Sequence, residues 1–358
     1  MRSTRRIAAA AVAVTVLLPA AAAHGATRTV SAGPPGKVAG VPGDADSNQF
    51  FRKTVKVHVG DKVRWKFNGF HTVAIPAKGK QPPGLIGPDP TGAKVEGVND
   101  AAGNPFFFNG QPKLTLNPDG ALPAGGKTYN GKKLVGSGAP LGPGAPKPYT
   151  VKFTKKGSYS YYCTVHPGQK GTVKVVRKGK AIPSNKANAK AAKKEFAKVA
   201  KRLIKDAKFA GPPGNAVEAG HDTIATTFFR FFPATKNVPV GTTVTFAMSP
   251  KTTEAHTISF GPADYLTQIA NTFIGPDPAN PQGLPVVNPL VPFPSDPPPL
   301  PALDGTNHGN GFLSSGIIDR DAATPLNPGE SQITFSTAGT YSYICLIHPD
   351  MKGQIVVG

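Results

Sequence analysis

The chain has 358 residues, including 41 Gly and 39 Pro, and a formal net charge of +21. This length leaves room for two domains with complete cores. Only 17% of the residues are charged, and together with the high Gly and Pro content this composition excludes a mainly helical protein and favours strands joined by turns.

The N-terminus has the pattern of a sorting signal. Arg2, Arg5 and Arg6 precede an apolar run over residues 7–23, and small residues follow it. This order is typical of a cleavable export peptide, to which we assign residues 1–26, with the general or the twin-arginine route as its path. An uncleaved anchor is the alternative, because about 17 apolar residues is the short limit for spanning a bilayer. We expect the protein to be secreted or periplasmic.

Residues 27–178 show the alternation of a β-sandwich. Apolar residues occupy every second position in 55–59 and 63–67, on either side of a Gly-Asp pair, which predicts half-buried strands joined by a turn. His71 alternates with Val73 and Ile75, so we expect its imidazole to point inward from a strand. Tyr161 and Cys163 share a face of a later strand, and the tyrosine two residues before the cysteine suggests the packing device known as the tyrosine corner.

Long segments separate each early histidine from its cysteine. The segment from His71 to Cys163 is 92 residues and that from His256 to Cys345 is 89, and both are rich in Pro and Gly. They predict long loops that return to one end of a sandwich. The aromatic run at 106–108 is expected to form the core of such a loop.

Residues 179–209 differ from the rest of the chain. Ser184 can cap a helix, and Phe196, Val199 and Leu203 form an apolar stripe among lysines. The pattern predicts a helix over 184–208 that connects two domains and packs on one of them. The alternative is a basic face that contacts an anionic membrane or cell-wall surface.

The last part of the chain, 210–358, repeats the first. Ala-Gly-Pro-Pro-Gly at 32–36 recurs at 210–214, and Ile-Gly-Pro-Asp-Pro at 86–90 recurs at 274–278. The two cysteines lie 182 residues apart in matching contexts. A duplicated domain accounts for this better than a solenoid, whose period is much shorter.

Each repeat carries the same set of metal-binding residue types. A loop supplies Cys, then His three residues later, then a third donor after three more, and an upstream strand supplies a second His. The two sets are His71, Cys163, His166 and Gln169, and His256, Cys345, His348 and Met351. Two cysteines in an exported protein would ordinarily suggest a disulfide, but their matching Cys-x-x-His-Pro contexts favour metal. A trigonal His2Cys set with a weak axial Met or Gln is the pattern of a type 1 copper site.

Both repeats resemble cupredoxins, the blue copper proteins, and the Cys-x-x-His-Pro-x-Met-x-Gly loop is most similar to that of amicyanin. The resemblance implies an all-β protein with two tandem Greek-key β-sandwich domains joined by the basic helix, each holding one type 1 copper ion. Gln169 in place of Met resembles the axial Gln of stellacyanin-type proteins, so we expect the first site to have the lower reduction potential. Thr72 and Thr257 stand where many small cupredoxins have Asn.

The function that follows is electron transfer outside the cytoplasm, not hydrolysis. We expect a redox partner protein or a small redox molecule as partner, and no nucleic acid. The net charge is +14 over residues 27–176 and −6 over 209–358, which would favour docking of the two sandwiches. A two-domain copper redox enzyme and a copper storage or delivery protein are the alternatives. Of the eight histidines, four belong to the two sets and His24 lies at the signal boundary. The remaining His58, His221 and His308 are too few for a trinuclear copper cluster.

Overall fold

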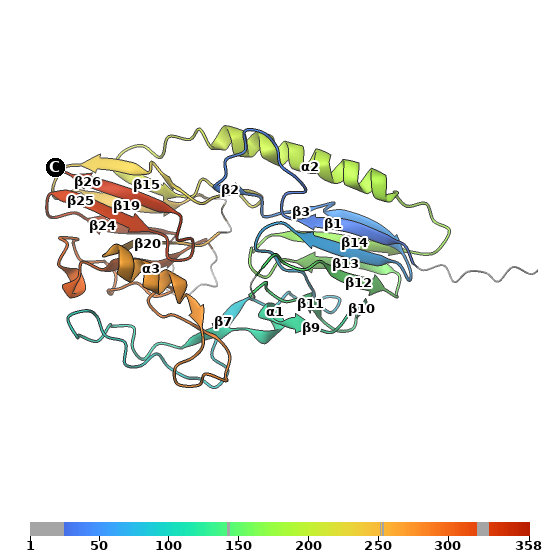
Figure 1. Ribbon diagram of the computed structural model, residues 1–358, viewed down its shortest axis with the longest axis horizontal. Coiled ribbons are helices and arrows are strands. Elements are labelled where there is room, and N and C mark those ends of the chain that lie inside the picture. The colour runs from blue at the N-terminus through green and yellow to red at the C-terminus, as the bar shows by residue number, and fades with distance from the viewer. Residues whose placement is uncertain (1–24, 142–143, 251, 253, 321–328) are drawn as a thin grey trace, which may run out of the picture.

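The computed structural model describes residues 25–141, 144–250, 252, 254–320 and 329–358, so the expected export signal lies almost entirely outside the described residues. The fold is all-β, with two sandwiches side by side and one long helix, α2, across them (Figure 1). This architecture confirms the fold class predicted from the sequence.

The N-terminal sandwich contains two sheets. One has the strand order β10-β12-β5-β1-β3 and the other β4-β14-β13-β6-β11-β9. The strands of the first sheet are β1 (Thr27–Ala32), β3 (Phe50–Phe51), β5 (Lys62–Phe67), β10 (Thr128–Tyr129) and β12 (Tyr149–Phe153). Those of the second are β4 (Thr54–His58), β6 (Ala74–Ile75), β9 (Pro123–Ala124), β11 (Val135–Ser137), β13 (Gly157–Tyr162) and β14 (Lys170–Val176).

The C-terminal sandwich repeats this plan. Its sheets have the orders β17-β15-β19-β24 and β18-β26-β25-β20-β23. The strands of the first are β15 (Ala216–Ala219), β17 (Phe231–Phe232), β19 (Thr243–Met248) and β24 (Glu330–Thr334). Those of the second are β18 (Thr235–Val238), β20 (His256–Phe260), β23 (Leu313–Ile318), β25 (Gly339–Ile344) and β26 (Lys352–Val357).

Two small sheets join the halves of the molecule. In one, β2 (Ala45–Asp46) pairs with β16 (Thr227–Phe228). In the other, β7 (Ile86–Pro88) and β8 (Leu114–Leu116) come from the first half, and β21 (Ile274–Gly275) and β22 (Val286–Val287) come from the second. Because backbone hydrogen bonds cross between the halves at both places, the sandwiches are held against each other.

The cores follow from the period-2 pattern. Of the residues of β4 and β5 that the sequence marked as inward, Val55, Val57, Val63 and Trp65 are fully buried and Phe67 is partly buried. Behind each metal-candidate loop, a glycine lies flat against a tyrosine ring. A Cβ on Gly171 would be 2.2 Å from the Tyr161 ring, and one on Gly353 would be 2.4 Å from Tyr343. These glycines are required because no side chain fits between the strand and the ring.

The tyrosine-corner prediction named the wrong tyrosines. Tyr159 Oη donates to the carbonyl of Lys155 at 3.0 Å, and Tyr341 Oη donates to that of Thr337 at 2.9 Å. The hydrogen bond to a backbone carbonyl four residues upstream is therefore made four residues before each cysteine. Tyr161, two residues before its cysteine, instead packs edge-on against Trp65 in the core.

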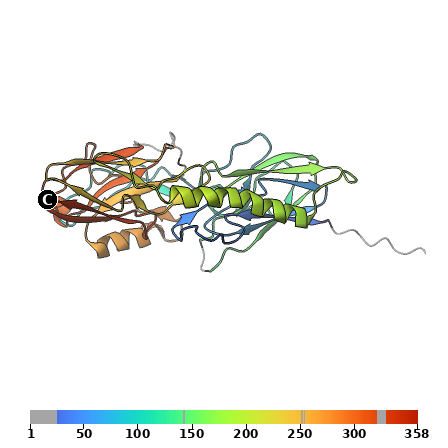
Figure 2. The same cartoon turned by 90° about the horizontal axis from the view of Figure 1, so that it is seen from above.

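The connecting helix is α2 (Asn185–Asp206), and Ser184 caps it by accepting a hydrogen bond from the backbone N–H of Ala187. Phe196 packs on Phe51 of the first half, whereas Leu203 packs with Phe228 and Phe232 of the second. The prediction that the helix packs on one domain is thus wrong, since its apolar stripe is long enough to reach both. Figure 2 shows the helix running along the molecule from above.

The long segments within each half fold against each other rather than as plain loops. They contain α1 (Pro118–Ala121), the 3-10 turn at Asn307–Gly309 and α3 (Ala263–Asn271), a helix that the sequence did not predict. Phe106 and Phe108 are buried as expected, whereas Phe107 of the same run is exposed. The two buried rings belong to one cluster with Leu266 and Phe312 from the second half. Among the described residues, no helix combines the length and apolar character needed to cross a membrane.

Candidate metal centres

The structure brings together both predicted ligand sets. We call His71, Cys163, His166 and Gln169 site 1, and His256, Cys345, His348 and Met351 site 2. Each Cys directly follows the last residue of a strand, β13 or β25. Two backbone hydrogen bonds close each loop, one of them from the N–H of Gln169 or Met351 to the carbonyl of the histidine three residues before it. Cys163 N–H donates to the Gln169 carbonyl at 3.0 Å, and Cys345 N–H donates to the Met351 carbonyl at 3.0 Å. Because both loops are closed in the same way, the thiol and the imidazole of each loop lie in one cluster.

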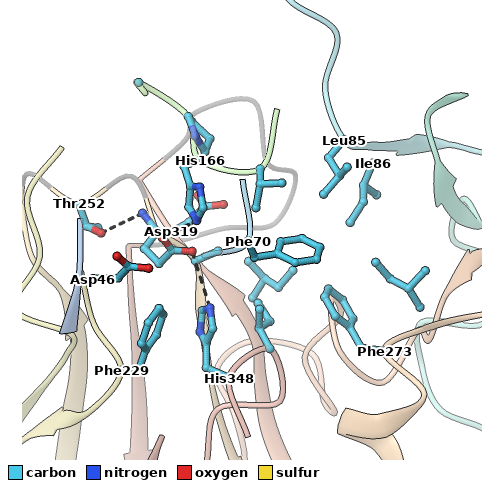
Figure 3. Close-up of a pocket in the computed structure, with 18 of the residues that line it drawn as sticks. Asp46, Phe70, Leu85, Ile86, His166, Phe229, Thr252, Phe273, Asp319 and His348 are labelled. Carbon is cyan, nitrogen blue, oxygen red and sulfur yellow. Dashed lines mark hydrogen bonds and ion pairs between the residues drawn. The ribbon is translucent and has the colours of Figure 1, made fainter. Parts of the chain in front are cut away.

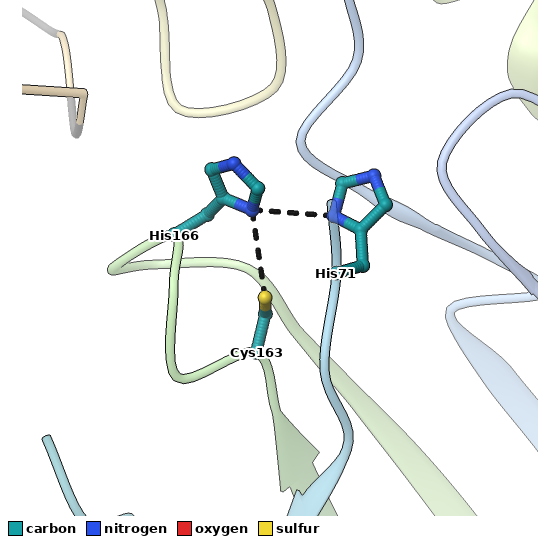
Figure 4. A group of neighbouring side chains, drawn as sticks. All are labelled: His71, Cys163 and His166. Atoms are coloured by element: carbon teal, nitrogen blue, oxygen red, sulfur yellow. Dashed lines mark hydrogen bonds between the residues drawn. The ribbon is translucent and has the colours of Figure 1, made fainter. Parts of the chain in front are cut away.

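Site 1 is compact and buried. His71 Nδ1 lies 3.2 Å from His166 Nδ1, and Cys163 Sγ lies 3.4 Å from the same His166 nitrogen (Figure 4). Donors that share one ion with bonds of about 2.0–2.3 Å stand roughly 3.3–3.8 Å apart. Two imidazole nitrogens and a thiol sulfur therefore converge at a spacing that one metal ion would satisfy. His71 itself lies just before β6, not within a strand as expected.

Site 2 has the same arrangement with slightly longer spacings. Cys345 Sγ lies 3.8 Å from His256 Nδ1 and 3.6 Å from His348 Nδ1. His256 opens β20, which is buried along its whole length. Within the described residues, these two clusters are the groups of His, Cys, Asp and Glu that converge closely enough to hold a metal ion.

The electrostatics of both sites favour thiolates. Burial raises the pKa of Cys163, but the His166 and His71 imidazoles outweigh it, so the pKa lies well below the usual value for a thiol. The pKa of Cys345 is lowered in the same way, with His256 and His348 as the neighbours. Because the thiolate is the metal-binding form, both cysteines are prepared as ligands.

Backbone amides also support each sulfur. The N–H of Thr72 donates to Cys163 Sγ at 3.4 Å, and the N–H of Thr257 donates to Cys345 Sγ at 3.3 Å. The Thr72 hydroxyl accepts from the backbone N–H of Thr164, whereas the Thr257 hydroxyl accepts from that of Leu346. Each threonine thus ties the histidine segment to the cysteine loop, which accounts for the residue type at this position.

The fourth predicted residue differs between the sites. Gln169 is buried, its Oε1 lies 3.1 Å from His71 Nδ1, and its Nε2 has no hydrogen-bond partner within the described chain. The amide oxygen is thus directed at the cluster. Met351 is fully buried among the core residues that include Cys345.

The outer partners of the two inner histidines also differ. His256 Nε2 lies 3.3 Å from Asp222 Oδ2, and both side chains are fully buried. Burial alone would lower the pKa of His256, but Asp222 and Cys345 raise it to about 10. His71 Nε2 is buried without a partner among the described residues, and a Cβ on Gly33 would approach it to 2.7 Å. Close packing against Gly33 therefore holds the His71 ring in place, whereas the Asp222 carboxylate holds the His256 ring.

One carboxylate lies between the two sites. Glu254 Oε2 is 3.8 Å from His166 Nε2 of site 1, and Glu254 Oε1 is 3.7 Å from His348 Nε2 of site 2. Asn48 donates a hydrogen bond to Glu254 Oε2 at 2.8 Å from the other half of the molecule. Burial would lower the pKa of His166, but the Cys163 thiolate, Glu254 and Asp46 raise it to about 9. The outer histidines of the two sites therefore face each other across a shared anion.

The sequence did not point to Asp222 or Glu254. Each is a single acidic residue in a segment without periodicity, and each contacts its histidine only after folding. The available clue in the sequence was the position of Glu254, two residues before the predicted ligand His256.

The three other histidines that the structure describes lie apart from both sites. His58 contacts the carbonyl of Lys180, and His221 stacks on Phe209 beside Glu218. His308 lies between the carboxylates of Asp100 and Asp296, at 3.2 and 2.9 Å.

The comparisons with known proteins are as follows. No family model and no curated protein sequence matches the chain. Among solved structures, a purple cupredoxin from Nitrosopumilus maritimus is 16% identical, with 40% of this chain and 100% of that one covered and a TM-score of 0.20. A mutant amicyanin in its Cu(I) form is 17% identical (41% and 85% covered, TM-score 0.22), and a mutant fern plastocyanin is 19% identical (40% and 99% covered, TM-score 0.22). Similarity at this level says nothing about function, so the assignment of a function rests on the two clusters.

Proposed function

We propose that the chain is an exported copper protein that transfers single electrons through two type 1 copper ions. The observation that carries this proposal is the convergence, twice in one chain, of two imidazole Nδ1 atoms and one buried cysteine Sγ with a lowered pKa. The proposed ligands are His71, Cys163, His166 and Gln169 in site 1, and His256, Cys345, His348 and Met351 in site 2.

The donor set fits copper in both oxidation states. Thiolate suits Cu(I), imidazole suits both states, and a weak axial donor lets the ion change its charge with little rearrangement. When bound, copper would supply reversible one-electron chemistry. The chain would supply a rigid, dry cavity, because every proposed ligand except His348 is buried.

The organisation of the chain belongs to the same proposal. We assign residues 1–26 to an export signal, 27–178 and 210–358 to two tandem cupredoxin domains, and 179–209 to their helical linker. The internal repeats and the matching order of strands in the two sandwiches support this division. Contact of the lysine-rich face of α2 with an anionic membrane or cell-wall surface is an additional proposal, supported by the lysines that its packed stripe leaves exposed.

We also propose that site 1 has the lower reduction potential. An amide oxygen from Gln169 would act on the ion directly and stabilise Cu(II), whereas Met351 offers a softer thioether. Asp222 works in the opposite sense at site 2, because an anion on the far side of His256 makes the ring a better donor to Cu(II). Since Asp222 acts only through the ring, we expect the axial ligand to decide the order.

The test is the copper content and visible spectrum of the mature protein after oxidation. Two coppers per chain and an intense thiolate-to-Cu(II) band are expected, and stepwise reduction should resolve two potentials. Zinc or no metal at the two sites, together with no visible band after Cu(II) is added, would contradict electron transfer. A structural metal site or a binding module would then be the remaining explanation.

A further inference from the structure

A cavity of about 790 Å³ lies between the two halves, next to both sites. Its walls include segments of both halves, such as Phe70 and Leu141 from the first and Phe273 and Ile317 from the second. This volume is in the range of pockets that hold small organic molecules. The cavity exists only because the sandwiches are held together, so neither half alone could form it.

The imidazole edges of both outer histidines open into this cavity. His166 and His348 line it, and their side chains are 10% and 20% exposed. Glu254, which contacts both rings, lines it as well. A flat protein surface cannot enter a cavity between two packed sandwiches, whereas a small molecule can lie against both ring edges at once. The geometry therefore favours a small molecule over a protein at this entrance.

The cavity has an apolar end and an acidic end. Figure 3 shows Phe70, Leu85, Ile86 and Phe273 together on one side, whereas Phe229 lies on the other side, against the His348 ring. The histidines and the polar groups stand on the other side: His166, His348, Asp46, Thr252 and Asp319. Three carboxylates against the single guanidinium of Arg320 disfavour an anionic ligand. They accept hydrogen bonds, and so fit a neutral molecule with hydroxyl groups at one end and an apolar body.

We propose that this cavity binds a substituted hydroquinone, which is the electron donor of the protein; the proposal rests on the two copper sites proposed above. A hydroquinone loses two electrons and two protons to become a quinone. Two one-electron acceptors at one cavity would match this stoichiometry, because a Cu(II) ion held by each proposed site would accept one of the two electrons. The protons leave to water from the acidic end of the cavity. The two O–H bonds of the hydroquinone break, and no bond to the protein forms.

The first test measures binding without copper, so it does not depend on redox activity. Trimethylquinone is titrated calorimetrically into the metal-free full-length protein, and saturable binding of one molecule is expected. Phe70→Ala should weaken it about tenfold or more, since a truncated aromatic anchor commonly costs this much. Leu141→Trp, which places a larger ring at the cavity wall and narrows the cavity, should also weaken it. The control is Phe107→Ala, because Phe107 is also an exposed phenylalanine but lies outside the cavity. No saturable binding, or equal weakening by the control, would overturn the proposal.

The second test uses the copper-loaded, oxidised protein in a stopped-flow instrument. One equivalent of trimethylhydroquinone should bleach both sites, at a rate that saturates with its concentration and falls at least tenfold in Leu141→Trp. Reduced cytochrome c, as a protein donor, should bleach the sites more slowly than the hydroquinone. A faster reaction with cytochrome c, or a hydroquinone rate unchanged in Leu141→Trp, would refute the proposal while leaving two working copper sites. Absence of any thiolate-to-Cu(II) band would instead refute the proposed function itself.

Discussion

Sites 1 and 2 share one loop but are surrounded differently. In both, the same two backbone hydrogen bonds close the loop, a threonine N–H supports the sulfur, and two Nδ1 atoms face the thiol. The differences lie at the fourth residue, Gln169 or Met351, and behind the inner histidine, where site 2 has Asp222 and the described part of the chain gives His71 Nε2 no partner. The chain thus keeps the same Cys-x-x-His loop in both halves and varies the side chains that surround it.

Removing one thiolate at a time has the largest expected effect. Cys163→Ser should abolish the colour and redox activity of site 1 and leave site 2, and Cys345→Ser should do the reverse, because a hydroxyl is a poor ligand for Cu(I). Copper content and visible absorption of each variant provide the measurement. If Cys163→Ser changes nothing and Cys345→Ser removes the whole band, site 1 does not bind copper and the two-site comparison fails.

Asp222→Asn tests the anion behind His256. Loss of a charged partner to a metal-binding histidine typically weakens metal binding 10–100-fold, and we expect this at site 2 only, with a higher reduction potential there. Competitive copper titration and potentiometry measure both effects. Asn retains the size of Asp and can still accept from the backbone N–H of Phe228, which Asp222 now binds at 2.7 Å. An equal change at site 1 would mean that the substitution acts through general unfolding.

Gln169→Met makes the axial positions identical. We expect the reduction potential of site 1 to rise by at least about 59 mV, which is a tenfold change in the equilibrium constant for one-electron reduction. Any difference that remains between the sites would then report mainly on Asp222. The reverse change, Met351→Gln, is the matched variant and should lower the potential of site 2. Unchanged potentials in both variants would show that neither residue acts as an axial ligand.

Glu254→Gln is the substitution expected to move both sites together. Its carboxylate lies within 3.8 Å of one outer histidine from each site, so removing its charge should raise both potentials by a smaller, similar amount. Gln can still accept the hydrogen bond that Asn48 donates. Potentiometry that resolves the midpoint potential of each site measures the effect. A shift confined to one site would show that Glu254 acts on that site alone.

The parts that could be predicted from the sequence are those with a local pattern. Period-2 alternation located the strands that carry Trp65 and Tyr161, a capped apolar stripe located α2, and the repeated Cys-x-x-His spacing located both clusters. Asp222, Glu254 and α3 carried no such pattern. Their roles depend on contacts between distant segments, such as Asn48 with Glu254, and on the packing of the two long segments around Phe108 and Leu266. No spacing within one segment encodes that kind of contact.

The smallest predicted effect is on stability, and it concerns the tyrosine corners of the two sandwiches. Tyr159 is buried and its hydroxyl donates to two backbone carbonyls, those of Lys155 and Lys156. The Tyr341 hydroxyl donates to one carbonyl among the described residues, that of Thr337, in an exposed setting. Tyr159→Phe should therefore lower the free energy of unfolding by about 1 kcal/mol, and Tyr341→Phe by less. Chemical denaturation of the metal-free protein measures both. If Tyr341→Phe proves the more costly, the hydroxyl contacts do not determine the stability of the corners, and packing of the Tyr341 ring on Phe335 becomes the better explanation.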